Sequence, residues 1–148
     1  MGTAGARTAC EFARGSNAGA DDAIGREDEA AMSDIVRLGN SPRWSDVVIH
    51  AGVARWVEVA EDVSGDARSQ IGQVLKQIDS TLAQVGSGRT QLMEILIFLA
   101  DLRDAPTLNE LWDAWVPRGG APIRACVQAG LGAGCRVEMI VTAAAGNQ

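Results

Sequence analysis

Residues 92–100 read LMEILIFLA, a nearly continuous apolar run. A short run of this kind is typical of a strand buried on both faces of a sheet. It lies between two segments, 67–85 and 105–116, whose apolar residues recur with a helical period. The core of the fold is therefore predicted to be one buried strand between two helices.

Each flanking segment carries a single apolar stripe, as expected for a helix that packs on a sheet. The stripe of residues 67–85 consists of Ile71, Val74, Leu75, Ile78, Leu82 and Val85, and that of residues 105–116 of Leu108, Leu111, Trp112 and Trp115. Ser64 or Asp66 can cap the first helix, and Gly86 can end it. Asp104 can cap the second helix.

Short apolar segments bounded by turn residues predict the strands, at 34–38, 47–50, 53–59, 123–129 and 136–143. The Ala51-Gly52 pair predicts a hairpin between the second and third. The order β-β-β-α-β-α-β-β indicates an α+β fold, a mixed sheet with both helices on one face. Residues 32–148 are predicted to form this single domain. The open sheet face would then be covered by oligomerisation.

The first 31 residues differ in composition from the rest of the chain. Ala and Gly fill 14 of the 31 positions without apolar periodicity. Such a segment buries too little surface to offset its ordering entropy, so we expect a disordered extension. A sharper interpretation places the natural start at Met32. The segment lacks the apolar stretch of a signal peptide, and we expect a cytoplasmic protein.

Composition excludes several classes of protein. The 148 residues carry a net charge of −6 and a pI near 4.7, which disfavours binding to nucleic acid. No apolar run approaches the roughly 20 residues of a membrane helix. One histidine and three cysteines without zinc-motif spacing predict neither a metal centre nor a disulfide scaffold.

Three polar residues in the last two predicted strands are candidates for chemistry. Arg124 and Cys126 alternate onto one face of an otherwise apolar strand, where a guanidinium needs an anion or water. Glu138 can pair with Arg124 in a salt bridge or hold a water as general base. Cys126 is a small core thiol or, with a favoured thiolate, a nucleophile. Trp44 can wall a pocket or fill an interface.

An ordered set of segments carries a family resemblance. These segments are RWSDVVIH (43–50), IFLADLRD (97–104), NELWDAWVP (109–117), APIRACVQA (121–129) and VEM (137–139). Together they resemble the Rid/YjgF family of reactive imine and enamine deaminases, and in particular its small YoaB-like branch. The similarity covers about residues 33–145.

The resemblance implies a chorismate-mutase-like fold, a homotrimer with clefts between subunits, and a 2-imino acid bound there without a cofactor. It places Arg124 on the substrate carboxylate, Glu138 on the attacking water and Cys126 in the same pocket. Asn109 would support the site, and Trp44 stands where the main branch has a tyrosine from the neighbouring subunit.

The chain departs from the family pattern at Val57-Glu58, where the main branch has a substrate-binding Ser-Gly pair. We expect these two positions to contact substrate, and the loss of the Ser-Gly pair predicts a changed substrate, weak activity or none. The main hypothesis is cofactor-independent hydrolysis of 2-imino acids to 2-keto acids and ammonia. The alternative is a non-catalytic module that binds small 2-keto acids. An endoribonuclease is a third hypothesis, which the acidic charge opposes.

Overall fold

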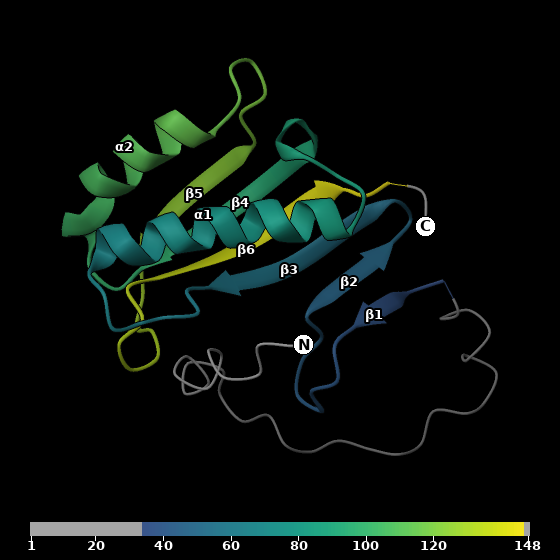
Figure 1. The fold of residues 1–148 in the computed structure, drawn as a ribbon, viewed down its shortest axis with the longest axis horizontal. Helices are drawn as coiled ribbons and strands as arrows, with labels where there is room; N and C mark the ends of the chain where they lie inside the picture. Colours follow the sequence, from purple (N-terminus) through teal and green to yellow (C-terminus); the bar gives the residue numbers. More distant parts are fainter. Residues whose placement is uncertain (1–33, 147–148) are drawn as a thin grey trace.

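A computed structural model describes residues 34–146 (Figure 1). The predicted extension over residues 1–31 lies outside the described residues. Within them the elements are β1 (Val36–Leu38), β2 (Val47–His50), β3 (Val53–Val59), α1 (Ala67–Gln84), η2 (Arg89–Gln91), β4 (Leu92–Leu99), η3 (Leu102–Asp104), α2 (Ala105–Trp115), β5 (Ile123–Gln128) and β6 (Val137–Ala144). The predicted order of strands and helices is confirmed.

The strands form one six-stranded sheet within residues 34–146, in the order β1-β2-β3-β6-β4-β5. Only the β4–β5 pair is parallel in this sheet, so the sheet is mixed as predicted. Both helices lie on the same face of the sheet (Figure 1). The chain enters β5 from α2, which makes α2 and β5 neighbours at one edge. This arrangement places the polar residues of β5 next to α2.

The hairpin between β2 and β3 forms at the predicted turn. Ala51 and Gly52 both have positive φ, at 50° and 75°, as a two-residue turn of this hand requires. The start of α1 is also as predicted, because the Asp66 side chain accepts a hydrogen bond from the Ser69 backbone N–H. Asp104, in contrast, makes no capping bond to α2 and accepts from the Arg136 guanidinium at 2.8 Å.

The core lies between the helices and one sheet face. The helix stripes pack on alternate residues of the strands, and the fully buried members include Ile71, Ile78, Leu82, Ile95, Ile97, Leu99, Leu108 and Met139. The expectation that β4 is buried on both faces is wrong in the single chain. Leu96 and Phe98, on the face away from the helices, are only half-buried, because no helix of residues 34–146 covers that face (Figure 1).

One polar side chain, Gln70, sits inside this core and is fully buried. Its Nε2 donates to the carbonyls of Val63, Gly65 and Gly134 at 2.9–3.2 Å. Its Oε1 accepts from the backbone N–H of Arg136 at 2.8 Å. Gln70 thus joins α1 to the loops before α1 and before β6, and it satisfies backbone groups that burial would otherwise leave unpaired.

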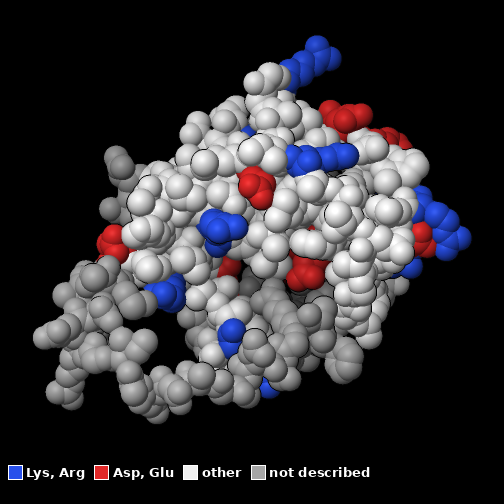
Figure 2. All heavy atoms as spheres, turned by 180° about the vertical axis from the view of Figure 1, so that it is seen from behind, with Lys and Arg blue, Asp and Glu red and all other residues white. Residues whose placement is uncertain are grey.

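The open face of the sheet is shown in Figure 2, which views the molecule from behind the sheet. Most of the described surface there is neutral, and the charged residues are scattered with both signs mixed. Exposed apolar residues on β5, Ile123 and Val127, belong to this face. No helix within residues 34–146 has the length and apolar character needed to cross a membrane.

Candidate functional site

The candidate site is centred on Arg124, which lies on β5 at the edge of the sheet. Arg124 pairs in register with Ile95, a core residue of β4, so its side chain leaves the sheet on the helix-covered face. There its Nη2 donates to Asn109 Oδ1 on α2 at 2.9 Å. Its Cζ also lies 5.2 Å from the centroid of the Trp112 ring.

The guanidinium of Arg124 is held by a neutral amide and an indole. Among the described residues no carboxylate pairs with it, although the arginines at 68, 89, 103 and 136 each pair with an Asp or Glu. Arg124 is also exposed. One hydrogen bond to Asn109 leaves most of its five N–H groups available. The arrangement can therefore bind an external carboxylate through two parallel hydrogen bonds.

Cys126 and Gln128 share the helix-covered face of β5 with Arg124, as strand alternation predicts. Cys126 is half-buried and is a free thiol. Burial raises its pKa above the ordinary value of 9.0, and the nearby Arg124 charge only partly offsets this. Cys126 is thus a neutral thiol near pH 7, which disfavours a nucleophilic role.

This pKa predicts the reactivity of Cys126 towards alkylating reagents. We expect iodoacetamide to label Cys126 more slowly at pH 7 than it labels a cysteine in a short peptide. The rate should still be rising above pH 9, because a raised pKa moves thiolate formation to higher pH. Peptide mass spectrometry resolves Cys126 from the other cysteines. Rapid labelling at pH 6–7 would contradict this prediction.

Glu138 on β6 does not join Arg124 within one subunit. It pairs in register with Phe98, which pairs with Val127. Val127 points to the face of β5 opposite Arg124, so Glu138 lies on the open face of the sheet. The salt-bridge alternative for Arg124 and Glu138 is therefore wrong for a single chain. The register could not be read from the sequence, which shows only the alternation within each strand.

The Val57-Glu58 pair is split between the two faces of β3. Val57 pairs with Ile140 and faces the open side, whereas Glu58 pairs with Met139 and faces the helices. Three strand spacings separate β3 from β5, which is roughly 14 Å. A role for these two residues in binding substrate remains a prediction, and it would need a second subunit.

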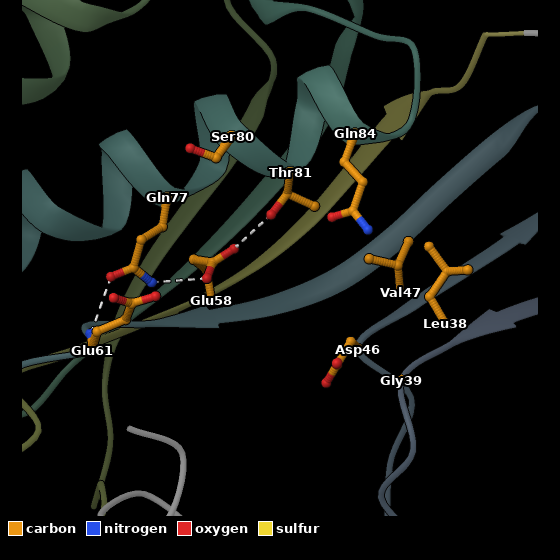
Figure 3. Close-up of a pocket in the computed structure, with 10 residues that line it drawn as sticks. All are labelled: Leu38, Gly39, Asp46, Val47, Glu58, Glu61, Gln77, Ser80, Thr81 and Gln84. Atoms are coloured by element: carbon orange, nitrogen blue, oxygen red, sulfur yellow. Dashed lines mark hydrogen bonds between the residues drawn. The ribbon is translucent and has the colours of Figure 1, made fainter. Parts of the chain in front are cut away.

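Glu58 is 6% exposed and lies beneath α1 (Figure 3). Its carboxylate accepts from Trp56 Nε1 at 3.0 Å, from Gln77 Nε2 at 2.9 Å and from Thr81 Oγ1 at 3.3 Å. The donors Gln77 and Thr81 join α1 to β3. Glu58, Gln77 and Thr81 also line a pocket of about 330 Å³, whose opposite side is lined by Leu38, Gly39, Asp46 and Val47. This pocket lies near the β1–β3 edge of the sheet, away from Arg124.

The remaining sequence candidates are placed as follows. Asn109 is an exposed residue of α2 and accepts a hydrogen bond from Arg124, and its supporting role in substrate binding stays a prediction. Trp44 is half-buried in the loop between β1 and β2, near the opposite edge of the sheet. Within residues 34–146 no group of three or more His, Cys, Asp or Glu side chains is placed to hold a metal ion.

Sequence reasoning missed one contact in the site. Trp112 was predicted as a core residue from its place on the helix stripe, and it is indeed buried. The structure shows that its ring also faces the Arg124 guanidinium. The three-residue spacing of Asn109 and Trp112 could have predicted this contact, because residues at i and i+3 share one face of a helix.

Comparisons with known proteins agree on the family. The family model described as Endoribonuclease L-PSP matches residues 29–145. The RutC family protein YoaB of Escherichia coli K12 is 45% identical over 97 residues, which cover 66% of this chain and 85% of YoaB. A RutC family protein of Haemophilus influenzae is 38% identical over 112 residues, covering 74% of this chain and 97% of the relative.

Solved structures support the same assignment. A YjgF-family protein from Neisseria meningitidis superposes with a TM-score of 0.72 at 37% identity, covering 78% of this chain and 98% of the other. An uncharacterized protein from Pseudomonas aeruginosa superposes with the same TM-score at 41% identity, covering 76% and 99%. With its mixed sheet, its two helices and Arg124 at the sheet edge, the chain belongs to the Rid/YjgF family.

Proposed function

We propose that this protein hydrolyses reactive 2-imino acids, and their enamine tautomers, to 2-keto acids and ammonia. The observation that carries the proposal is Arg124, an exposed guanidinium held by Asn109 and Trp112 with no carboxylate of the described chain on it. A substrate carboxylate supplies the missing anion. One relative supports the reaction class by its name. A rat 2-iminobutanoate/2-iminopropanoate deaminase is 32% identical over 85 residues, covering 57% of this chain and 61% of that protein.

Arg124 fixes the position of the reacting carbon. Two parallel hydrogen bonds fix the plane of the bound carboxylate. Because the imine carbon is bonded directly to the carboxylate carbon, its position is fixed as well. Cys126 lies two residues along the same face of β5, about 7 Å away. Its neutral thiol lines the pocket next to the imine and offers a weak hydrogen-bond donor.

Water attack needs a base on the other side of the substrate, and we assign this role to Glu138. Because Glu138 lies on the open face of its own sheet, it reaches the substrate of Arg124 only from a second subunit. Val57 faces the same open side, and Trp44 lies near the sheet edge opposite β5. These residues are proposed to meet β5 and α2 of the neighbouring copy.

The reaction balances without a cofactor. The water oxygen bonds to C2 while the C=N electron pair moves to nitrogen, and Glu138 takes a water proton and passes it to that nitrogen. The resulting tetrahedral intermediate carries OH and NH2 on C2. Glu138 then takes the hydroxyl proton and passes it to the NH2 group, the C–N bond breaks, ammonia leaves, and the C2 oxygen becomes the keto group.

The assembly proposed for this site is a homotrimer. The sheet face away from the helices is mostly neutral (Figure 2) and carries the exposed Ile123 and Val127 together with half-buried Leu96, Phe98 and Ile140. An apolar face of this size is unusual on a monomer. Packing three such faces together buries them and brings the β5 edge of each copy against its neighbour.

A second candidate function is the binding of 2-keto acids without catalysis, and the position of Glu138 is the reason to test it. Within residues 34–146 no carboxylate pairs with Arg124, and Glu138 of the same subunit lies on the opposite face of the sheet. A protein that only binds 2-keto acids would need Arg124 and Asn109 alone. The endoribonuclease activity in the family description is not proposed, since the net charge of −6 opposes contact with phosphates.

The test generates 2-iminopropanoate and 2-iminobutanoate in place with an amino-acid oxidase and follows their trapping by semicarbazide. We expect the protein to reduce the semicarbazone signal, because imine is hydrolysed before it is trapped. No reduction from a folded trimer, together with calorimetric binding of 2-ketobutyrate, would replace hydrolysis by the binding function. Absence of both would contradict the assignment of Arg124 to carboxylate binding.

A further inference from the structure

We infer that Trp112 is a positioning residue, which holds the guanidinium plane of Arg124 in the orientation that receives the substrate carboxylate. The contact between Trp112 and Arg124 is taken from the structure alone. Its effect on substrate binding rests on the proposed function. The Arg124 Cζ lies 5.2 Å from the Trp112 ring centroid. That distance is within the range in which a ring face attracts a cation.

Asn109 and Trp112 hold Arg124 in complementary ways. They lie three residues apart on α2, on the side that faces β5. Asn109 binds one Nη2 hydrogen and so fixes one edge of the guanidinium. The indole faces the guanidinium and so limits rotation of its plane. A long side chain at an exposed sheet edge would otherwise sample many rotamers.

The indole of Trp112 is itself held in place by its neighbours. Its ring lies 5.6 Å from that of Trp115, at an angle of 50°. Trp115 donates from Nε1 to Asp79 Oδ1 at 3.2 Å, and the Arg89 Cζ lies 5.1 Å from the Trp115 ring. Arg89 in turn binds both oxygens of Asp79 at 2.8 Å. The platform beneath Arg124 is therefore fixed from α1.

Arg89 and Arg124 differ in one respect that supports the assignment. Both lie over an indole, but the charge of Arg89 is taken by Asp79. Among residues 34–146, the partners of the Arg124 guanidinium are Asn109 and the ring of Trp112. The ring thus orients Arg124 without neutralising it. A carboxylate in the same place would orient the side chain but would also compete with the substrate anion.

The first test observes Arg124 without any substrate. In a ¹H–¹⁵N spectrum, the Nε–H signal of Arg124 is assigned by its loss in Arg124→Lys. We expect it to lie upfield of exposed arginines, because the ring current of Trp112 acts on it. Trp112→Leu should remove this shift, and Trp112→Phe should keep part of it. A wild-type signal at the ordinary position would overturn the inference whether or not any variant folds.

The second test measures 2-ketobutyrate binding by calorimetry. Trp112→Leu should weaken binding about threefold to thirtyfold, as expected for a lost cation–π contact, and Trp112→Phe should restore most of the affinity. Ile71→Ala is the control for a loss of core packing, because Ile71 is fully buried on α1 and is not among the residues that hold Arg124 or the Trp112 ring. It should lower Tm while leaving the Arg124 signal and the affinity within twofold of wild type.

The two tests separate this inference from the proposed function. If wild type binds no 2-keto acid and hydrolyses no imine, the proposed function fails, and the Arg124 signal still decides the role of Trp112. If wild type binds but Trp112→Leu folds with unchanged signal and affinity, the positioning role is wrong and the proposed function stands.

Discussion

Replacing Arg124 by alanine is expected to abolish imine hydrolysis and to weaken 2-ketobutyrate binding about 100-fold or more. A carboxylate held in two charge-assisted hydrogen bonds contributes about 3 kcal/mol or more, and each 1.4 kcal/mol is tenfold in affinity. The fold should be unaffected, because Arg124 is exposed at the sheet edge and, among residues 34–146, its side chain hydrogen-bonds to Asn109 alone. The measurements are the semicarbazide assay, calorimetry and the native mass.

Two variants control this experiment. Arg124→Lys keeps the charge but loses the paired donors, so we expect it to retain part of the affinity and little activity. Arg68→Ala makes the same change in net charge on α1, at an exposed ion pair with Glu110 that includes neither Arg124 nor Asn109, and should behave as wild type. Full activity in Arg124→Ala would contradict the assignment of the carboxylate-binding residue.

Replacing Gln70 by glutamate is expected to lower the free energy of unfolding by about 3 kcal/mol or more. The side chains are nearly equal in size, but a carboxylate cannot donate to the carbonyls of Val63, Gly65 and Gly134. At this chain length the loss corresponds to a fall in Tm of about 6–12 °C. Thermal unfolding followed by circular dichroism measures it.

The loss in Gln70→Glu should also depend on pH. Burial next to three carbonyls raises the pKa of the new carboxyl in the folded state above its unfolded value. The variant is therefore closest to wild type at low pH, where the acid is protonated, and becomes less stable as pH rises.

Gln73→Glu is the matched control for Gln70→Glu, one turn further along α1. Gln73 is half-buried and bonds to Asp62 at the surface, so water can replace its partners and the cost should be about 1 kcal/mol or less. Equal losses in the two variants would contradict the central role of the Gln70 bonds.

The sequence predicted most of the fold because its signals are local. The helical stripe from Ile71 to Val85 could be buried only on one side, and Ala51-Gly52 could take the positive φ angles of a tight turn. The bounds of strands and helices accordingly agree with prediction to within about two residues.

The parts that could not be predicted depend on contacts between distant segments. Gln70 interrupts no stripe and matches no motif, and its burial becomes clear only when the loops before α1 and β6 meet around it. The sequence alone predicts Glu58 as a substrate-binding residue. The structure shows instead that its carboxylate accepts hydrogen bonds from Gln77 and Thr81 on α1.

The candidate site was predictable only where its residues lie on one strand. Alternation along 123–129 correctly placed Arg124 and Cys126 on one face. It could not place Glu138, because the face of β6 relative to β5 is set by register through β4. The salt bridge, one of the two alternatives for Glu138, is therefore excluded within one subunit only by the register of the assembled sheet.

In the proposed assembly, Arg124 of one subunit and Glu138 of another form one site. The most direct measurement co-expresses Arg124→Ala and Glu138→Gln with different tags and assays the purified mixed trimers for imine hydrolysis. Each variant alone should be inactive. Each purified mixed trimer should recover about a third of the wild-type activity, because one of its three interfaces joins an intact Arg124 to an intact Glu138. Mixed trimers, verified by native mass spectrometry, that remain as inactive as either variant would contradict the shared site.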